Sequence, residues 1–307
     1  MTEREYDDPH TLTSAEVVVG VDGSPGAAIA LRWAADYAVR HGRALRIVNG
    51  LNLAGTSSAA GPYTVITPQI IDIARAQGRT LLRHASESVR ANHPDLRITT
   101  HMTADSAAAL LIAESAEAYT VVLGATGSVG TLGHLGSTLL GVTAHAQGSV
   151  IVVRPDPDAG LTVRDTGPVV VGVDGSKVSE PAIAAAFAEA SERGAELIAV
   201  HVWSDWNAGT FAGQFPESGL DALEGVEEAL LAERLAGWRE KYPDVRVQQR
   251  VYFTSPSTQL LEWSKHAQLV VVGNRGRGGF LGMLLGSTAF ALVQHGQCPV
   301  MVVHAAE

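Results

Sequence analysis

Residues 17–24 read Val-Val-Val-Gly-Val-Asp-Gly-Ser, and residues 169–176 read the same. The register between the two copies then holds without a gap as far as Leu45 and Leu197. A repeat of this length is a duplicated domain and not a solenoid unit, because solenoid periods run from about 20 to about 50 residues. We therefore expect two similar domains, at residues 13–156 and 166–305.

Short apolar runs alternate with segments of helical periodicity in both halves. The first half predicts strands at 17–21, 45–51, 96–101, 120–123 and 150–153. The second half predicts strands at 169–173, 197–203, 245–252, 269–272 and 300–303, with helices at 180–193, 220–242, 257–266 and 287–295. Strands separated by helices imply right-handed crossovers and a mostly parallel sheet that is covered on both faces. The predicted fold class is α/β, with two tandem doubly wound five-stranded domains.

A glycine-rich loop follows the fourth strand of the second half. Residues 273–288 read Gly-Asn-Arg-Gly-Arg-Gly-Gly-Phe-Leu-Gly-Met-Leu-Leu-Gly-Ser-Thr. Glycine amides, a Ser-Thr hydroxyl pair and the positive end of a helix all favour an anion. Gly273 and Gly276 also suit ordinary turns, but their joint spacing with Gly286 and Ser287 favours contact with a nucleotide, whose phosphate chain would approach the loop.

Composition and motifs exclude several competing classes. The net charge of −10 over 307 residues argues against a nucleic-acid partner, and no apolar run is long enough for a membrane span. The polar, acidic N-terminus does not read as a signal peptide, which favours a cytoplasmic protein. The chain contains no P-loop motif, Rossmann fingerprint, nucleophile elbow or His-Glu-x-x-His zinc motif. The single cysteine, Cys298, reads as a buried structural thiol.

These motifs together resemble the universal stress protein family. The resemblance rests on the Val-Gly-Val-Asp-Gly-Ser strand ends, the Gly-x2-Gly-x9-Gly-Ser loop and the closing Cys-Pro-Val-Met-Val-Val, and it covers nearly the whole chain twice. More narrowly, the chain is similar to the tandem ATP-binding members typical of mycobacteria and related actinobacteria. The resemblance implies the adenine nucleotide alpha-hydrolase-like strand order 3-2-1-4-5. It also implies ATP, with or without Mg²⁺, bound between the first and fourth strands, with no dedicated protein site for the metal.

The resemblance assigns site residues to both halves. In the second half, which we favour as the ATP site, they are Asp174, Val202 (through its main chain), Gly273, Gly276, Arg277, Gly286, Ser287 and Thr288. In the first half they are Asp22, Gly50, Gly124, Gly127, Gly136, Ser137 and Thr138. The first-half loop has one residue fewer between Gly127 and Gly136 than the second has between Gly276 and Gly286, and it lacks an arginine. Because consecutive Cα atoms lie about 3.8 Å apart, that deletion shifts the donors of the first loop.

Several of these residues also have structural interpretations. Asp22 and Asp174 in Asp-Gly-Ser suit a helix cap or a turn as well as a ligand contact. His145 and His295, repeated in place, read as polar packing residues because no nucleophile motif accompanies them. Trp203 and Trp206 read as cover for the edge of the core.

Two classes of function remain open from the sequence. The favoured class is a stress-response regulator in which ATP binding changes conformation or partner choice, and for which no catalytic residue is assigned. The alternative is a slow ATPase or phosphotransferase that uses the same site. For the first half alone, a purely structural dimerisation module is a third interpretation. In tandem members of the family the domains pair through their last strands, here from Val150 to Val153 and from Val300 to Val303, and homodimerisation is left open.

Overall fold

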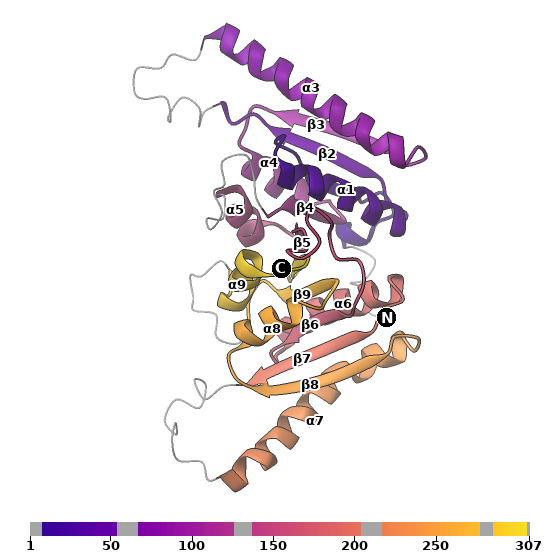
Figure 1. Cartoon of the computed structure of the whole chain (residues 1–307), viewed down its shortest axis with the longest axis vertical. Coiled ribbons are helices and arrows are strands. Elements are labelled where there is room, and N and C mark those ends of the chain that lie inside the picture. Colours follow the sequence, from indigo (N-terminus) through magenta and orange to yellow (C-terminus); the bar gives the residue numbers. More distant parts are fainter. Residues whose placement is uncertain (1–7, 54–66, 126–136, 204–216, 277–284, 306–307) are drawn as a thin grey trace. The chain divides into compact units, whose positions relative to one another are not determined.

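The computed structural model describes residues 8–53, 67–125, 137–203, 217–276 and 285–305, with the side chains of 177 and 217–224 excepted. The chain divides into two compact units, one ending at Arg154 and the other running from Pro155 to Ala305. Each unit is an α/β domain with its own parallel sheet (Figure 1).

Unit 1 contains a five-stranded sheet in the order β3-β2-β1-β4-β5, and every neighbouring pair is parallel. Its elements are the 3-10 turn η2 (Pro9–Thr11), β1 (Val17–Gly20), α1 (Pro25–Arg40), β2 (Leu45–Gly50), α3 (Pro68–Asn92), β3 (Ile98–Thr103), α4 (Ala107–Ser115), β4 (Thr120–Gly124), α5 (Ser137–His145) and β5 (Ser149–Val153).

Unit 2 repeats this arrangement, with the parallel order β8-β7-β6-β9-β10. Its elements are β6 (Val169–Val173), the 3-10 turn η3 (Lys177–Ser179), α6 (Glu180–Glu192), β7 (Leu197–Trp203), α7 (Glu217–Lys241), β8 (Val247–Phe253), α8 (Pro256–Ser264), β9 (Leu269–Gly273), α9 (Ser287–His295) and β10 (Val300–Val303). Both units therefore confirm the predicted order 3-2-1-4-5.

The third strand of each unit begins two residues later than the sequence suggested. A turn occupies the preceding residues in both units, because Leu96 N donates to His93 O at 3.2 Å and Val245 N donates to Tyr242 O at 3.2 Å. The polar residues between helix and strand thus turn the chain before pairing starts.

The helices of each unit cover both faces of its sheet. In unit 1, α1 packs beside α3, whereas α4 packs beside α5 and contacts β1, β2 and β4. The central strands between these layers are Val-rich and fully buried, as expected for a parallel sheet covered on both faces. This arrangement leaves the carboxyl ends of the strands as the edge where a ligand can reach the main chain.

Each first strand carries a glycine where a leucine of the covering helix packs. A Cβ atom on Gly20 would stand 3.0 Å from Leu111 of α4, and one on Gly172 would stand 2.8 Å from Leu260 of α8. Both leucines are almost completely buried, at 1% and 2% exposure. The glycine within Val-Val-Val-Gly-Val therefore lets the helix approach the strand closely.

Candidate functional site

Asp174 and Gly276 meet at the carboxyl edge of the unit 2 sheet. Asp174 follows β6, the loop containing Gly276 follows β9, and these two strands are parallel neighbours. A Cβ atom built on Gly276 would stand 3.1 Å from Asp174 Oδ2. The backbone of Gly276 therefore passes directly beside the carboxylate of Asp174.

The two carboxylate oxygens of Asp174 differ in their surroundings. Oδ1 accepts hydrogen bonds from Ser176 N at 2.8 Å and from Ser176 Oγ at 2.7 Å, which shapes the turn after β6. Oδ2 is the oxygen that faces Gly276. The turn-forming interpretation of this aspartate and the ligand-facing interpretation are thus compatible, because each uses a different oxygen.

The glycine loop leads into the amino end of α9. Gly286 is the N-cap residue and makes no side-chain cap, while its amide donates to Asn274 O at 2.8 Å. A Cβ atom on Gly286 would lie 3.3 Å from that same carbonyl oxygen. Ser287 and Thr288 then form the first turn of the helix. First-turn amides and the positive end of the helix dipole attract anions, so this end of α9 suits a phosphate group.

Val202 lies one strand away from Asp174. The register of β6 and β7 pairs Val173 with His201, which places Val202 of β7 beside the aspartate. Val202 is the last residue but one of β7, so its main chain lies close to the carboxyl edge, where the resemblance assigns the adenine contact. The structure thus gathers the described candidates of unit 2 around the ends of three neighbouring strands and the start of α9.

The corresponding turn of unit 1 is a tighter helix cap. Asp22 Oδ1 accepts from Ser24 N at 2.9 Å, and Ser24 Oγ accepts from Ala27 N at 3.1 Å, so that α1 begins directly at Pro25. In unit 2 the equivalent residues form η3, and α6 begins only at Glu180. The two turns therefore present different backbone to any ligand, although their sequences both begin Asp-Gly-Ser.

Gly50 and Gly124 are needed for backbone packing in unit 1. A Cβ atom on Gly50 would stand 2.6 Å from Ala107 N at the start of α4, and one on Gly124 would stand 2.5 Å from Gly26 O. Side chains essentially never approach backbone so closely, so both positions require glycine with or without a ligand. Ser137 and Thr138 begin α5, as their counterparts begin α9. Three other candidates, Gly127, Gly136 and Arg277, lie outside the described residues.

A polar group that the sequence analysis missed lies directly behind the candidate site. The buried ring of His201 is bonded through Nδ1 to Val173 O at 2.7 Å and through Nε2 to Glu227 Oε2 at 2.7 Å. Asn49 holds the same position in unit 1, where its Nδ2 donates to Val21 O at 2.7 Å. The available signal was a polar residue at the fifth position of both second strands, Leu-Arg-Ile-Val-Asn-Gly and Leu-Ile-Ala-Val-His-Val-Trp.

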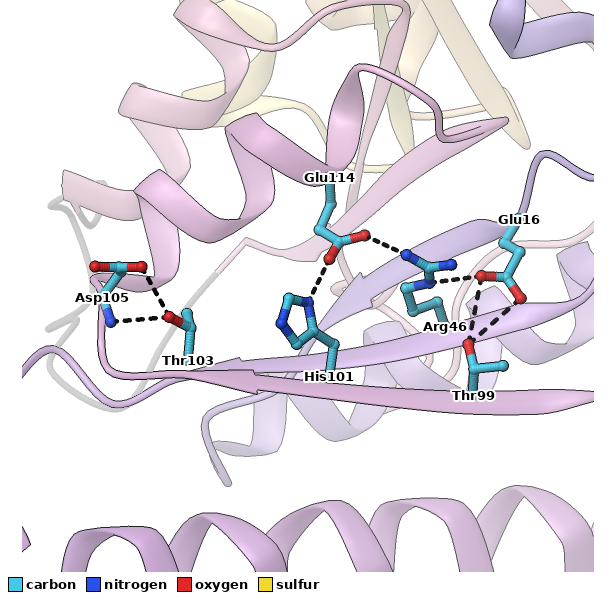
Figure 2. A network of polar contacts seen from close by, with 7 residues as sticks. All are labelled: Glu16, Arg46, Thr99, His101, Thr103, Asp105 and Glu114. Carbon is cyan, nitrogen blue, oxygen red and sulfur yellow. Dashed lines mark hydrogen bonds and ion pairs between the residues drawn. The ribbon is translucent and has the colours of Figure 1, made fainter.

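A second polar cluster, in unit 1, lies away from the candidate site. Figure 2 shows Arg46 between two carboxylates, with Nε donating to Glu16 at 2.5 Å and a terminal nitrogen donating to Glu114 at 2.8 Å. His101 Nδ1 lies 2.5 Å from the other oxygen of Glu114. Burial alone would lower the pKa of Arg46, but hydrogen bonds and charges from Glu114 and Glu16 outweigh it and raise the pKa above its usual value. Because Glu16 precedes β1 whereas Asp22 follows it, Glu16 lies at the opposite end of this strand from the candidate residue Asp22.

The described part of the chain contains neither a cluster of metal ligands nor a membrane-spanning helix. No group of three or more His, Cys, Asp or Glu side chains there is arranged as metal ligands. No helix among the residues covered by the structure is long and apolar enough to cross a membrane. His145 is exposed, and its Nδ1 is bonded to Gly141 O of its own helix at 2.9 Å. His295 is exposed as well, so the interpretation of these two histidines as packing residues is wrong.

The fold and the loop after the fourth strand define a doubly wound α/β protein whose candidate site lies at the carboxyl edge of the sheet. The model of the Universal stress protein family matches residues 15–154 and again 166–304, and the chain belongs to that family. It is 41% identical over 300 residues to a universal stress protein of Mycolicibacterium smegmatis, with 95% of this chain and 98% of that protein covered. A universal stress protein of Mycobacterium tuberculosis is 38% identical over 298 residues, covering 94% and 96%. The crystal structure of a universal stress protein from Archaeoglobus fulgidus has the same fold, with a TM-score of 0.68, 18% identity and coverage of 96% and 100%.

Proposed function

We propose that this protein is a cytoplasmic, ATP-binding regulator of the stress response and that unit 2 carries the main ATP site. The observation that carries the proposal is the approach of Gly276 to Asp174 beside the first turn of α9. A glycine backbone, a carboxylate and a helix amino end at one edge can serve the phosphates and the ribose of one nucleotide. Membership of the universal stress protein family supports a role in stress response.

The roles of the site residues follow from their chemistry. In the proposed complex, Asp174 Oδ2 accepts from a ribose hydroxyl, and the amides around Gly286, Ser287 and Thr288 donate to phosphate oxygens. The main chain near Val202 contacts the adenine, and Arg277 adds a positive charge to the phosphate end. Mg²⁺ would be held by the phosphates themselves, without a dedicated site on the protein.

Calorimetric titration with ATP, ADP and AMP tests the proposal. We expect ATP to bind, and we expect Gly286→Asp to abolish most of the affinity because it places a carboxylate beside the phosphates. Gly136→Asp is the matched control, since it makes the same change at the corresponding position of unit 1. If Gly286→Asp folds normally and binds ATP as the parent does, the glycine loop is not the site.

We also propose that the two units pair within the chain through β5 and β10. Each is the outermost strand beside the fourth strand of its own sheet, and both are apolar. Unpaired edge strands expose amides and carbonyls that favour pairing with another strand. The same edges would also be available for homodimerisation if the intrachain pair opened.

A further inference from the structure

Helix α7 is connected to the backbone on both sides of Asp174, directly on one side and through His201 on the other. Glu227 of α7 is bonded to the His201 ring, which is bonded in turn to the carbonyl of Val173. Two turns further along α7, Arg234 Nε donates to the carbonyl of Gly175 at 3.1 Å. Val173 and Gly175 are the neighbours of Asp174 in the sequence, so α7 fixes the peptide groups that set the direction of its side chain.

The contact between His201 and Glu227 requires one proton more than a neutral imidazole and an ionised carboxylate carry together. A carbonyl oxygen only accepts, so His201 Nδ1 must carry hydrogen in its 2.7 Å contact with Val173 O. Nε2 lies 2.7 Å from a carboxylate oxygen of Glu227, and an ionised carboxylate also only accepts. A second proton must therefore lie between His201 and Glu227. The imidazole is 2% exposed, so water cannot replace that bond readily.

Glu227 is the charged side chain that contacts the ring within the described part of unit 2. The charged residues Arg234, Glu180 and Asp174 on the surrounding elements have partners of their own. Arg234 of α7 is bonded to the Gly175 carbonyl and lies 3.7 Å from Glu180 of α6, which also accepts from Trp238 Nε1 at 3.2 Å. The carboxylate of Asp174, which follows β6, accepts a hydrogen bond from Ser176 N. The neighbouring strand β8 pairs an uncharged valine with His201.

Unit 1 makes the same carbonyl contact without a titratable group. Asn49 donates from Nδ2 to Val21 O at 2.7 Å, the distance seen for His201 and Val173 O. An amide keeps this bond at every pH, because its protons do not dissociate in the accessible range. The repeat has therefore retained the carbonyl contact in both copies, whereas the proton-dependent connection to a helix belongs to unit 2.

We propose that His201 and Glu227 are positioning residues that make the unit 2 site responsive to pH. With the shared proton present, α7 holds the Val173 carbonyl and the turn that carries Asp174. As the pH rises, the proton is lost, the lone pair of Nε2 faces a carboxylate, and the contact with α7 opens. A state that binds an extra proton is disfavoured as the pH increases, so the site becomes less ordered at alkaline pH. The effect on affinity rests on the proposed ATP site, whereas the effect on α7 does not.

Two conservative variants separate this role from simple packing. In Glu227→Gln the side-chain amide can donate to the neutral ring, so the contact stays but needs no shared proton. In His201→Asn the carbonyl contact is kept in the form found at Asn49, but the connection to α7 is lost. Glu227→Leu removes the connection and leaves the histidine in place.

The test combines ATP titration with amide hydrogen exchange of residues 225–241 of the full chain, from about pH 6 to about pH 9. We expect the ATP affinity of the parent to fall about threefold to tenfold over this range, and the exchange of α7, corrected for the intrinsic pH dependence, to rise. In Glu227→Gln, the ATP affinity should not fall as the pH rises, and the α7 amides should stay protected. In His201→Asn, the affinity should also not fall with pH, but the α7 amides should be less protected. ATP itself ionises in this pH range, and this changes its affinity for the parent and for Glu227→Gln alike. The ratio of the two affinities therefore reports the contribution of the shared proton.

The proposal is overturned if Glu227→Gln keeps the pH slope of the parent, or if exchange in α7 does not change with pH. Absence of ATP binding at every pH would contradict the proposed function instead. In that case the exchange measurements alone decide whether His201 and Glu227 form a proton-dependent contact. A ¹⁵N spectrum that shows both ring nitrogens of His201 protonated at low pH and one at high pH would support it independently.

Discussion

Gly124 lies against Gly26, so close that a Cβ atom on Gly124 would stand 2.5 Å from the Gly26 carbonyl oxygen. At the corresponding place in unit 2, a Cβ atom on Gly273 would lie 3.8 Å from the Val178 carbonyl oxygen. The first turn of α1 is thus closer to the end of the fourth strand in unit 1 than η3 is in unit 2. This difference leaves less room between the two strand ends of unit 1.

We therefore expect unequal nucleotide sites. Calorimetry with ATP should give one dominant site per chain, which Gly286→Asp removes and Gly136→Asp leaves unchanged. The physical reasons are the narrower approach at Gly124 and the shorter glycine loop of unit 1. Two sites of equal affinity would show that the loop of unit 1 absorbs the missing residue.

Asp174→Asn tests whether the site binds or also hydrolyses ATP. Asparagine can still accept from Ser176, but it removes the negative charge of the oxygen that faces Gly276. Hydrogen bonds to charged groups contribute about 1.5–3 kcal/mol, so we expect an affinity loss of about tenfold or more. Phosphate release by the parent with Mg²⁺ should not exceed that of the variant. Steady turnover that Asp174→Asn abolishes would instead support the ATPase or phosphotransferase alternative.

Pairing through β5 and β10 can be tested with proline. Ile151→Pro and Met301→Pro each remove a backbone donor from one of these strands and should increase amide exchange in the other. Ile151→Val and Met301→Leu keep the donors and serve as controls. The pairing does not exist if β5 and β10 of the parent already exchange as fast as unpaired loops.

The segment of unit 2 that precedes β6 should loosen in acid. Asp156 accepts from the amide of Asp158 at 3.0 Å and from Arg164 Nε at 2.9 Å, and these bonds hold its pKa below the ordinary value of 3.8. A lowered pKa stabilises the loop above the pKa of the unfolded chain, and this contribution is lost as the pH falls through the lowered value. Pepsin cleavage within residues 155–167 should therefore increase only at strongly acidic pH. Arg164→Gln should move that increase to higher pH, and unchanged cleavage would show that the ion pair does not hold the loop.

Arg46 should stabilise unit 1 because two carboxylates depend on it. The side chains of Glu16 and Glu114 are only 11% and 10% exposed, whereas that of Arg46 is 39% exposed. Arg46→Met would leave two poorly solvated like charges, and we expect it to lower the free energy of unfolding by about 2 kcal/mol, a value reduced for solvent screening. Adding Glu114→Gln should recover part of the loss. Denaturant unfolding of Arg46→Met and of the double variant measures both effects, and Arg83→Met serves as a surface control.

The repeat and the apolar runs predict the strands, and the family resemblance implies their order and the edge of the sheet that carries the candidate site. It also predicts that Asp174 and the glycine loop meet. The contact between His201 and Glu227 could not be predicted in this way, since it depends on how a helix packs across a strand after a long connection. The close approach of Gly26 to Gly124 could not be predicted either. Both copies read Asp-Gly-Ser, but the helix that follows begins directly after this motif in unit 1 and three residues later in unit 2.

Gly172 and Leu260 come from distant parts of the chain, yet each limits what the other can be. The strand has no side chain at Gly172 because the leucine occupies that volume, 2.8 Å from where a Cβ atom would lie. A larger residue at the strand position is therefore tolerable only together with a smaller one on α8. Among related proteins the two positions should accordingly be substituted as a pair, and the same coupling should hold for Gly20 and Leu111 in the other unit.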